Sequence, residues 1–361
     1  MSKAKFAMAG RAAAGMTAAA FALACPVLAQ PAPQQPVQPG PQQLAQHSAL
    51  KRGVDAAHAA LLAGDYARAA ALAEPLADAG DPAAQHLMGY LYEKGLGVRA
   101  DIGAALRYYG DAAVAGNADA QVALGELALG GRNSFVDYER AAGWFRLAAA
   151  RGDARAEVRL GLMYAEGVGV SRDRAIAASH FATAAAKQNA DGAFYLGVAF
   201  LNGDGVPQNY PQAEKFFTLA ASKGHGEAAY HLALLYDAPA LGPPDPARAV
   251  AAMRAAARAG YPPAFAGMGL FAHRGDLVGD ADGAPADWFE KGMRAGDPQS
   301  AFLYAVALFK GDGRAKDAAA ARVIADQLIA APTTPDALRA SARRLQRDIA
   351  RQTPGPLTLR D

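Results

Sequence analysis

The chain repeats one pattern every 36 residues, and this period constrains its fold more than any other feature. A dipeptide opens each of seven units, in register throughout. The seven are Gly80-Asp81, Gly116-Asn117, Gly152-Asp153, Gln188-Asn189, Gly224-His225, Gly260-Tyr261 and Gly296-Asp297. A period of this length is typical of arrays in which one small unit stacks on the next. We therefore expect a single stack, although 361 residues alone would suggest two or three domains.

Each unit predicts a pair of helices. Ala84, Met88 and Tyr92 recur every four residues, which is the spacing of one helix face. Asp81 suits the N-cap of this helix, and Gly95 suits a left-handed C-cap. Second helices are expected to begin near Asp101, Asp137, Asp173, Asn209, Asp245 and Asp317. About a quarter of the chain is alanine, which favours helices and is depleted in strands. The sequence thus predicts an all-α stack of helix hairpins.

Small and bulky residues fall in fixed columns of the repeat. One column holds Gly89, Gly125, Gly161, Gly197 and Gly269, and another holds Ala105, Ala141, Ala177, Ala213, Ala249 and Ala321. Rings follow the alanines three residues later, at Tyr108, Trp144, His180, Phe216 and Trp288. We expect helices to touch at the small residues, so that a leucine at Gly161 would force them apart.

The unit resembles the Sel1-like repeat, a relative of the tetratricopeptide repeat. Residues 156–170 carry the resemblance best, through Leu160, Gly161, Tyr164, Gly167, Gly169 and Val170. The resemblance implies a right-handed α-solenoid that acts as an adaptor for other proteins. It divides the chain into a degenerate hairpin at 46–80, seven repeats at 81–332, and a capping helix with tail at 333–361. Three stretches depart from the pattern, at 131–134, 239–246 and 276–287.

The first 29 residues read as a secretory signal peptide. Lys3, Lys5 and Arg11 precede an uncharged apolar run that ends at Ala29, where we expect cleavage. Cleavage removes three positive charges and no acid, so the net charge falls from +2 to −1, which gives no electrostatic case for nucleic-acid binding. It also removes the only cysteine, Cys25, although a lipoprotein cut before Cys25 is a less favoured alternative. The Pro- and Gln-rich residues 30–45 predict an extended linker, and the location predicted is the periplasm.

The sequence favours no catalytic, metal or cofactor site. The Gly-x-Gly turns follow helices rather than strands and recur as structural columns, unlike phosphate-binding loops. None of the seven histidines pairs with another metal ligand at helical spacing. The loop with Asp276, Asp280, Asp282 and Asp287 has Val278 and Phe289 where a calcium loop needs acids. We therefore expect no cofactor and no enzymatic activity.

Function is expected on the concave face that the first helices line. The residues selected there are Val158, Leu162, Phe194, Val198, Leu201, Tyr230, Leu234, Phe302 and Val306. Exposed, they would form an apolar groove for a helix or extended peptide; in a tightly wound stack they would instead be buried. The first hypothesis is a monomeric periplasmic adaptor that binds a protein or peptide partner. The alternative is a cell-wall factor that binds or cleaves peptidoglycan or another glycan near Asp276.

Overall fold

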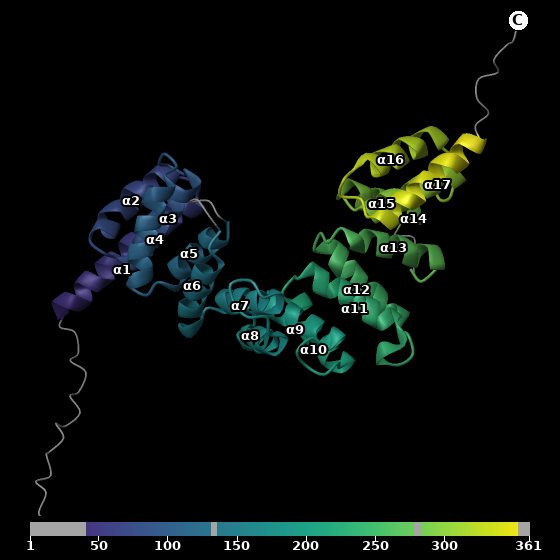
Figure 1. The fold of residues 1–361 in the computed structure, drawn as a ribbon. Coiled ribbons are helices and arrows are strands. Elements are labelled where there is room, and N and C mark those ends of the chain that lie inside the picture. Colours follow the sequence, from purple (N-terminus) through teal and green to yellow (C-terminus); the bar gives the residue numbers. More distant parts are fainter. Residues whose placement is uncertain (1–40, 131–135, 278–282, 353–361) are drawn as a thin grey trace, which may run out of the picture. The chain divides into compact units, whose positions relative to one another are not determined.

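The computed structural model describes residues 41–130, 136–277 and 283–352, and these contain only helices, turns and loops, with no strand (Figure 1). The chain divides into two compact units, residues 1–48 and 49–361, and the first contributes only the start of α1 to the described part. The predicted signal peptide, with Cys25, lies outside the described residues. The linker prediction is wrong for 41–45, because α1 begins at Pro41, a residue that suits the first turn of a helix.

Seventeen α-helices and one 3-10 helix follow one another in the described residues. Their bounds are α1 Pro41–Leu62, α2 Tyr66–Asp78, α3 Pro82–Lys94, α4 Ile102–Val114, α5 Ala118–Gly130, α6 Tyr138–Ala150, α7 Ala154–Glu166, α8 Arg174–Ala186, α9 Ala190–Asn202, α10 Tyr210–Ser222, α11 Gly226–Asp237, η1 Pro239–Leu241, α12 Pro246–Arg258, α13 Pro263–Arg274, α14 Pro285–Arg294, α15 Pro298–Lys310, α16 Ala318–Ala330 and α17 Asp336–Gln352.

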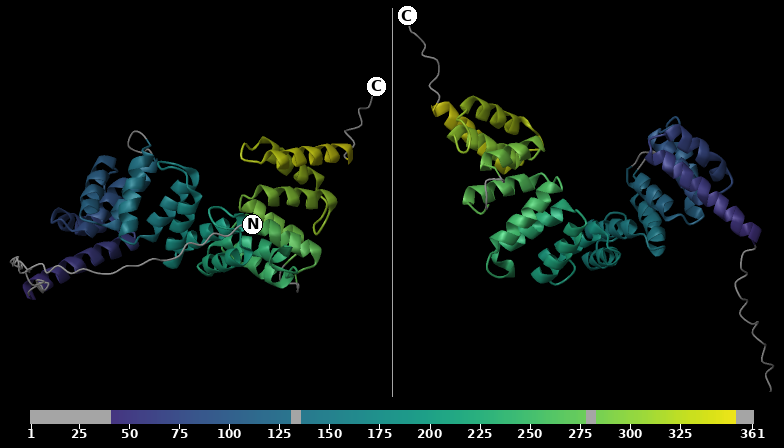
Figure 2. Two further views of the ribbon diagram at one scale, coloured as in Figure 1. Left: turned by 60° about the horizontal axis from the view of Figure 1, so that its bottom comes forward. Right: turned by 180° about the vertical axis from the view of Figure 1, so that it is seen from behind.

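Within residues 49–361 each helix from α2 onward packs mainly against its neighbours in the chain. The first helices of successive hairpins also touch, as α7 touches α9 and α13 touches α15. Figure 2 shows the same succession of hairpins from two further sides. The all-α class and the stack of helix hairpins are therefore confirmed.

The predicted helix ends are also confirmed. The Asp101 carboxylate accepts the Ala104 backbone N–H at 3.0 Å, and the other five acids or amides expected to start second helices cap them in the same way. Gly95 ends α3 in the left-handed region with φ 68°, where glycine is unstrained. Gln188 has φ 60° and is the one non-glycine residue of the described part in this region. It stands where the other units have glycine.

The glycine column receives a ring from the second helix of the same hairpin. A Cβ at Gly89, Gly125 or Gly197 would stand 2.6 or 2.7 Å from the ring of Tyr109, Phe145 or Phe217. Gly161 and Gly269 are closer still to Phe181 and Phe289. These rings lie one residue after the ring column that the sequence singled out. In the two remaining units, Ala233 and Ala305 replace the glycine, and Met253 and Ala325 replace the ring.

The ring column singled out in the sequence packs as well, but against a different partner. Tyr108 stacks on Tyr92 with ring centroids 5.7 Å apart, and His180 stacks on Tyr164 at 5.5 Å. Phe216 stacks on Phe200 at 5.7 Å. Each of these pairs joins the second helix of a hairpin to the end of its first helix.

The second glycine of three Gly-x-Gly turns lies closely against the preceding repeat. Gly169 follows α7 with φ 68° and lies against the Tyr138 backbone at the start of α6. Gly97 and Gly205 approach the backbone of Tyr66 and Arg174 in the same way. A side chain at any of these glycines would collide with backbone atoms, which cannot rotate away.

The hairpin of α13 and α14 departs most from the pattern. Neither N-cap residue, Pro262 or Ala284, caps its helix with a side chain, although the Asp287 carboxylate accepts the Ala284 backbone N–H at 3.0 Å. The turn at 239–246 contains η1, and Asp245 still caps α12. Of the departures noted in the sequence, 131–134 and residues 278–282 of the acidic loop lie outside the described residues.

Candidate partner-binding face

Three positions of each first helix lie on its solvent-facing side. The second follows the first by four residues, and the third follows the second by three. In α7 these positions are Arg155, Arg159 and Leu162, and in α9 they are Asp191, Tyr195 and Val198. Residues at this spacing lie on one side of a helix. We call this surface, from α5 to α13, the first-helix face. Its other members are Asp119 and Glu126 in α5, Glu227, His231 and Leu234 in α11, and Leu270 in α13.

The nine residues selected from the sequence fall into three groups. Val158 and Phe194 are buried, each with 6% of its surface exposed. Leu234 is 43% exposed. The six that are half-buried are Leu162, Val198, Leu201, Tyr230, Phe302 and Val306. The row of Val158 and Phe194 was expected to be available for binding, and for these two residues the buried alternative holds. The reason is that Phe194 points toward the next hairpin, where its ring lies 4.5 Å from that of His225.

Sequence reasoning missed the column of Arg159, Tyr195 and His231. A signal for it was present in the glycine column. Gly161 faces the second helix, and a residue two positions earlier is turned by about 200° around a helix of 3.6 residues per turn. Arg159 therefore points away from the hairpin core. Leu270, 46% exposed, also belongs to the face.

Two apolar cavities open among the first helices. One, of about 220 Å³, lies between α11 and α13, and Leu234, Leu270, Tyr230, Pro263 and Met253 are among its lining residues. The other, of about 200 Å³, is lined by Leu162 and Val198 together with residues of α8. Phe302 lines a third cavity of about 370 Å³, at the start of α15 and α17.

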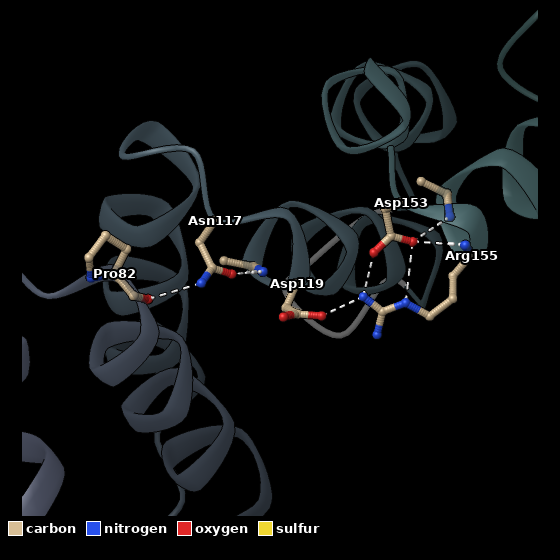
Figure 3. A network of polar contacts seen from close by, with 7 residues as sticks. Pro82, Asn117, Asp119, Asp153 and Arg155 are labelled. Carbon is tan, nitrogen blue, oxygen red and sulfur yellow. Dashed lines mark hydrogen bonds and ion pairs between the residues drawn. The ribbon is translucent and has the colours of Figure 1, made fainter. Parts of the chain in front are cut away.

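Ion pairs close the α5–α7 part of the first-helix face. Arg155 bridges Asp119 and Asp153, as Figure 3 shows, and Arg159 Nε lies 2.5 Å from a Glu126 carboxylate oxygen. Burial favours neutral Asp153, but hydrogen bonds from Arg155 and the Ala156 N–H outweigh it and lower the pKa of this carboxyl. In this part of the face, acids and bases are matched across neighbouring repeats.

Aromatic rings instead fill the α9–α11 part. The His231 ring stacks on Phe217 at 5.2 Å, and Tyr230 lies 5.3 Å from Tyr261. His225 caps α11, since its Nδ1 accepts the Ala228 N–H at 3.2 Å. This bond places the ring proton on Nε2, which lies 3.6 Å from an Asp191 oxygen.

Burial and nearby carboxylates shift the titration of these rings. Burial raises the pKa of Tyr195, and Asp191 and Glu227 add to the effect. Burial and Glu227, to which the Tyr261 hydroxyl donates, raise the pKa of Tyr261 to about 12. Burial lowers the pKa of His231 despite the opposing influence of Glu227. The tyrosines therefore stay neutral, and His231 resists protonation.

The remaining polar candidates form links between helices. His180 Nδ1 lies 2.7 Å from a carboxylate oxygen of the buried Glu157. In the acidic loop, Asp276 pairs with Arg274 at 2.6 Å and Asp287 pairs with Arg314 at 2.8 Å, while Asp280 and Asp282 lie outside the described residues. Across the described ranges, no three metal-ligating side chains come together, and no helix is long and apolar enough to cross a membrane.

Comparison with known proteins assigns the repeat. Residues 82–117, 118–153, 154–189, 190–225, 226–261 and 298–323 match the model of the Sel1 repeat, and together they cover more than half of the chain. The hairpin of α13 and α14, whose N-cap residues make no side-chain cap, falls between the last two matches. No curated protein sequence matches the chain.

Two solved structures are similar to this fold. A Sel1 repeat protein from Oxalobacter formigenes is 28% identical over 66% of this chain and 96% of its own, with a TM-score of 0.59. A protective antigen present in uropathogenic Escherichia coli strains, which displays an SLR fold, is 23% identical over 79% of this chain and 70% of its own, with a TM-score of 0.53. With six matched units in one register, this chain belongs to the Sel1 repeat family.

Proposed function

We propose that this chain is an exported, non-enzymatic adaptor that binds a peptide segment of a partner protein on its first-helix face. The observation that carries the proposal is the pair of exposed leucines, Leu234 and Leu270, beside a cavity of about 220 Å³. Large apolar side chains exposed next to a cavity are typical of a surface that a partner covers.

Export to the periplasm is supported by the N-terminal sequence. Three basic residues, an apolar run and the small residue Ala29 are the parts of a cleavable signal peptide. Mass spectrometry of the protein purified from the producing cell tests this directly. A first residue of Gln30 supports export, a lipidated Cys25 indicates an anchored form, and a retained Met1 contradicts export.

Site-specific photo-crosslinking tests the binding face. A photoreactive phenylalanine analogue is placed at Leu234, at Leu270 or, as a matched control, at Leu147 on the second helix α6. Leu147 is 50% exposed and so presents a similar apolar side chain outside the first-helix face. We expect a discrete protein adduct from positions 234 and 270 and none from 147.

Two outcomes contradict the proposal. Adducts of equal yield at all three positions would mean that the first-helix face is not selective. Sedimentation of the purified chain with isolated peptidoglycan, unaffected by Leu234→Gln with Leu270→Gln, would instead favour the cell-wall alternative.

A further inference from the structure

We propose that the segment bound on the α9–α13 part of the first-helix face is extended and carries a lysine or arginine about three residues from a large apolar residue. This inference rests on the proposed function and adds the chemistry of the partner. The basic side chain is assigned to Asp191 and Glu227, and the apolar one to the cavity beside Leu234 and Leu270.

The apolar half of the site is the cavity between α11 and α13. Leu234 and Leu270 form its exposed walls, and the buried Met253 lies among its lining residues. Gly267, at the column of Arg159 and Tyr195, also lines the cavity and lets the Met253 side chain lie directly against α13. A volume of about 220 Å³ accepts one large apolar side chain and not a helix.

Two acids of this part of the face, Asp191 and Glu227, have no lysine or arginine partner among the described residues, and Asp191 has only the His225 ring, 3.6 Å away. The Asp191 side chain is 63% exposed. Two arginines on neighbouring first helices are engaged elsewhere, since Arg159 pairs with Glu126, and Arg274 pairs with Asp237 at 2.8 Å. A cationic side chain of the partner would supply the missing charge.

Tyrosine rings lie on the same part of the face as these carboxylates. Tyr195 stands four residues after Asp191 on α9, one turn along the same side of the helix, and the Tyr261 ring lies 5.3 Å from that of Tyr230 on α11. Burial raises the pKa of Tyr195 and Tyr261, and Glu227 adds to both shifts, so both hydroxyls stay neutral. Neutral aromatic faces attract ammonium and guanidinium groups, so rings and carboxylates favour the same kind of ligand.

The spacing of the two halves sets the spacing in the partner. Glu227 and Leu234 are seven residues apart on α11, which at 1.5 Å per residue is about 10 Å. An extended chain in the polyproline II conformation advances about 3.1 Å per residue and completes one turn every three residues, so side chains three residues apart span about this distance on one face. The basic and apolar residues of the segment are therefore expected at i and i+3, in either order.

Selection of random peptides on the purified full chain tests the inference. Twelve-residue peptides displayed on phage are selected on the immobilised protein, and enriched peptides are then synthesised and titrated by fluorescence anisotropy. We expect enrichment of Lys or Arg three residues from Leu, Ile, Met or Phe. Binding of these peptides should weaken about tenfold in Asp191→Asn with Glu227→Gln, and should be lost in Leu234→Gln with Leu270→Gln.

Matched controls separate local from general effects. Glu139→Gln removes an exposed carboxylate from the start of α6, and Leu147→Gln removes an exposed leucine from the same helix. Both should bind the peptides as the unmodified chain does. Circular dichroism of every variant reports whether the helices are intact, and Asp191→Lys with Glu227→Lys should shift selection toward Asp and Glu.

The outcomes distinguish this inference from the function on which it rests. Peptides that need Leu234 and Leu270 but carry no basic residue, and that bind the Asp191→Asn, Glu227→Gln variant normally, would overturn the partner chemistry and leave the adaptor function standing. Failure to enrich any peptide, or binding that ignores all four residues, would overturn both.

Discussion

The first-helix face is built differently in two neighbouring parts of the same stack. Around α5 and α7 it presents Asp119 and Glu126 matched by Arg155 and Arg159. Around α9 to α13 the equivalent columns hold acids that pair with no lysine or arginine of the described residues, together with tyrosines and exposed leucines. The hairpins beneath are the same, with an alanine column and a glycine packed on a ring in most units. The repeated residues therefore maintain the packing of the hairpins, while the residues of the first-helix face vary independently of that packing.

The largest expected difference in stability is therefore between substitutions of buried residues of the first helices and substitutions on the first-helix face. Phe194→Ala empties a buried site against His225 and His231, and we expect a loss of about 3 to 5 kcal/mol in the free energy of unfolding. Leu234→Gln, at a position 43% exposed, should cost within about 0.5 kcal/mol. Urea unfolding followed by circular dichroism measures both. Equal losses in the free energy of unfolding for Phe194→Ala and Leu234→Gln would mean that burial does not distinguish the two positions.

If the packing of the hairpins is the same in both parts, substitutions in the glycine column should destabilise both parts equally. Gly161→Leu in α7 and Gly197→Leu in α9 each push a side chain into a ring, Phe181 or Phe217, at an estimated cost of about 1 to 3 kcal/mol or more. Thermal unfolding should show similar drops in melting temperature for the two variants. Gly143→Ala is the control, because its Cβ meets no atom within 4 Å. A large loss at only one of the two glycines would break the comparison.

The ion pairs of the α5–α7 part should contribute little to stability. Asp119 and Arg155 are more than half exposed, so water and salt screen their attraction. A double-mutant cycle of Asp119→Asn and Arg155→Gln should give a coupling free energy below about 1 kcal/mol. The coupling should shrink further in 1 M NaCl. A coupling that is large and insensitive to salt would mean that the pair is part of the core.

The smallest effect is the pH dependence of stability that His231 contributes in the α9–α11 part. Burial lowers the pKa of His231 in the folded state, so the unfolded chain takes up the proton first as pH falls. His231 therefore contributes stability at neutral pH that is lost as pH drops below the usual histidine pKa of about 6.5. His231→Phe keeps the ring on Phe217 and should flatten the decline between pH 7 and 5. His86, whose pKa burial also lowers, leaves a residual slope in both proteins.

Much of the fold could be predicted from the sequence because the residues that begin and end each helix act locally. Asp101 and Gly95 act within one helical turn, and their roles follow from residue type alone. The rotation of the first helices depends on the next hairpin, which the spacing of one helix does not reveal. Phe194 and Leu234 both belong to apolar columns, yet only contact with His225 and His231 decides that the former is buried. That Asp191 has a histidine and no arginine beside it likewise depends on the tertiary contact of Arg159 with Glu126.

The two kinds of glycine contact have a consequence for how such a chain changes over generations. The contact of Gly161 with Phe181 lies inside one hairpin, whereas Gly169 contacts the backbone of Tyr138 in the preceding hairpin, as Gly97 and Gly205 contact that of Tyr66 and Arg174. A new hairpin can therefore dock on a predecessor without matching its side chains. Duplication or loss of a 36-residue block would lengthen or shorten the array. The residues of the first-helix face could then change independently and adapt to a ligand.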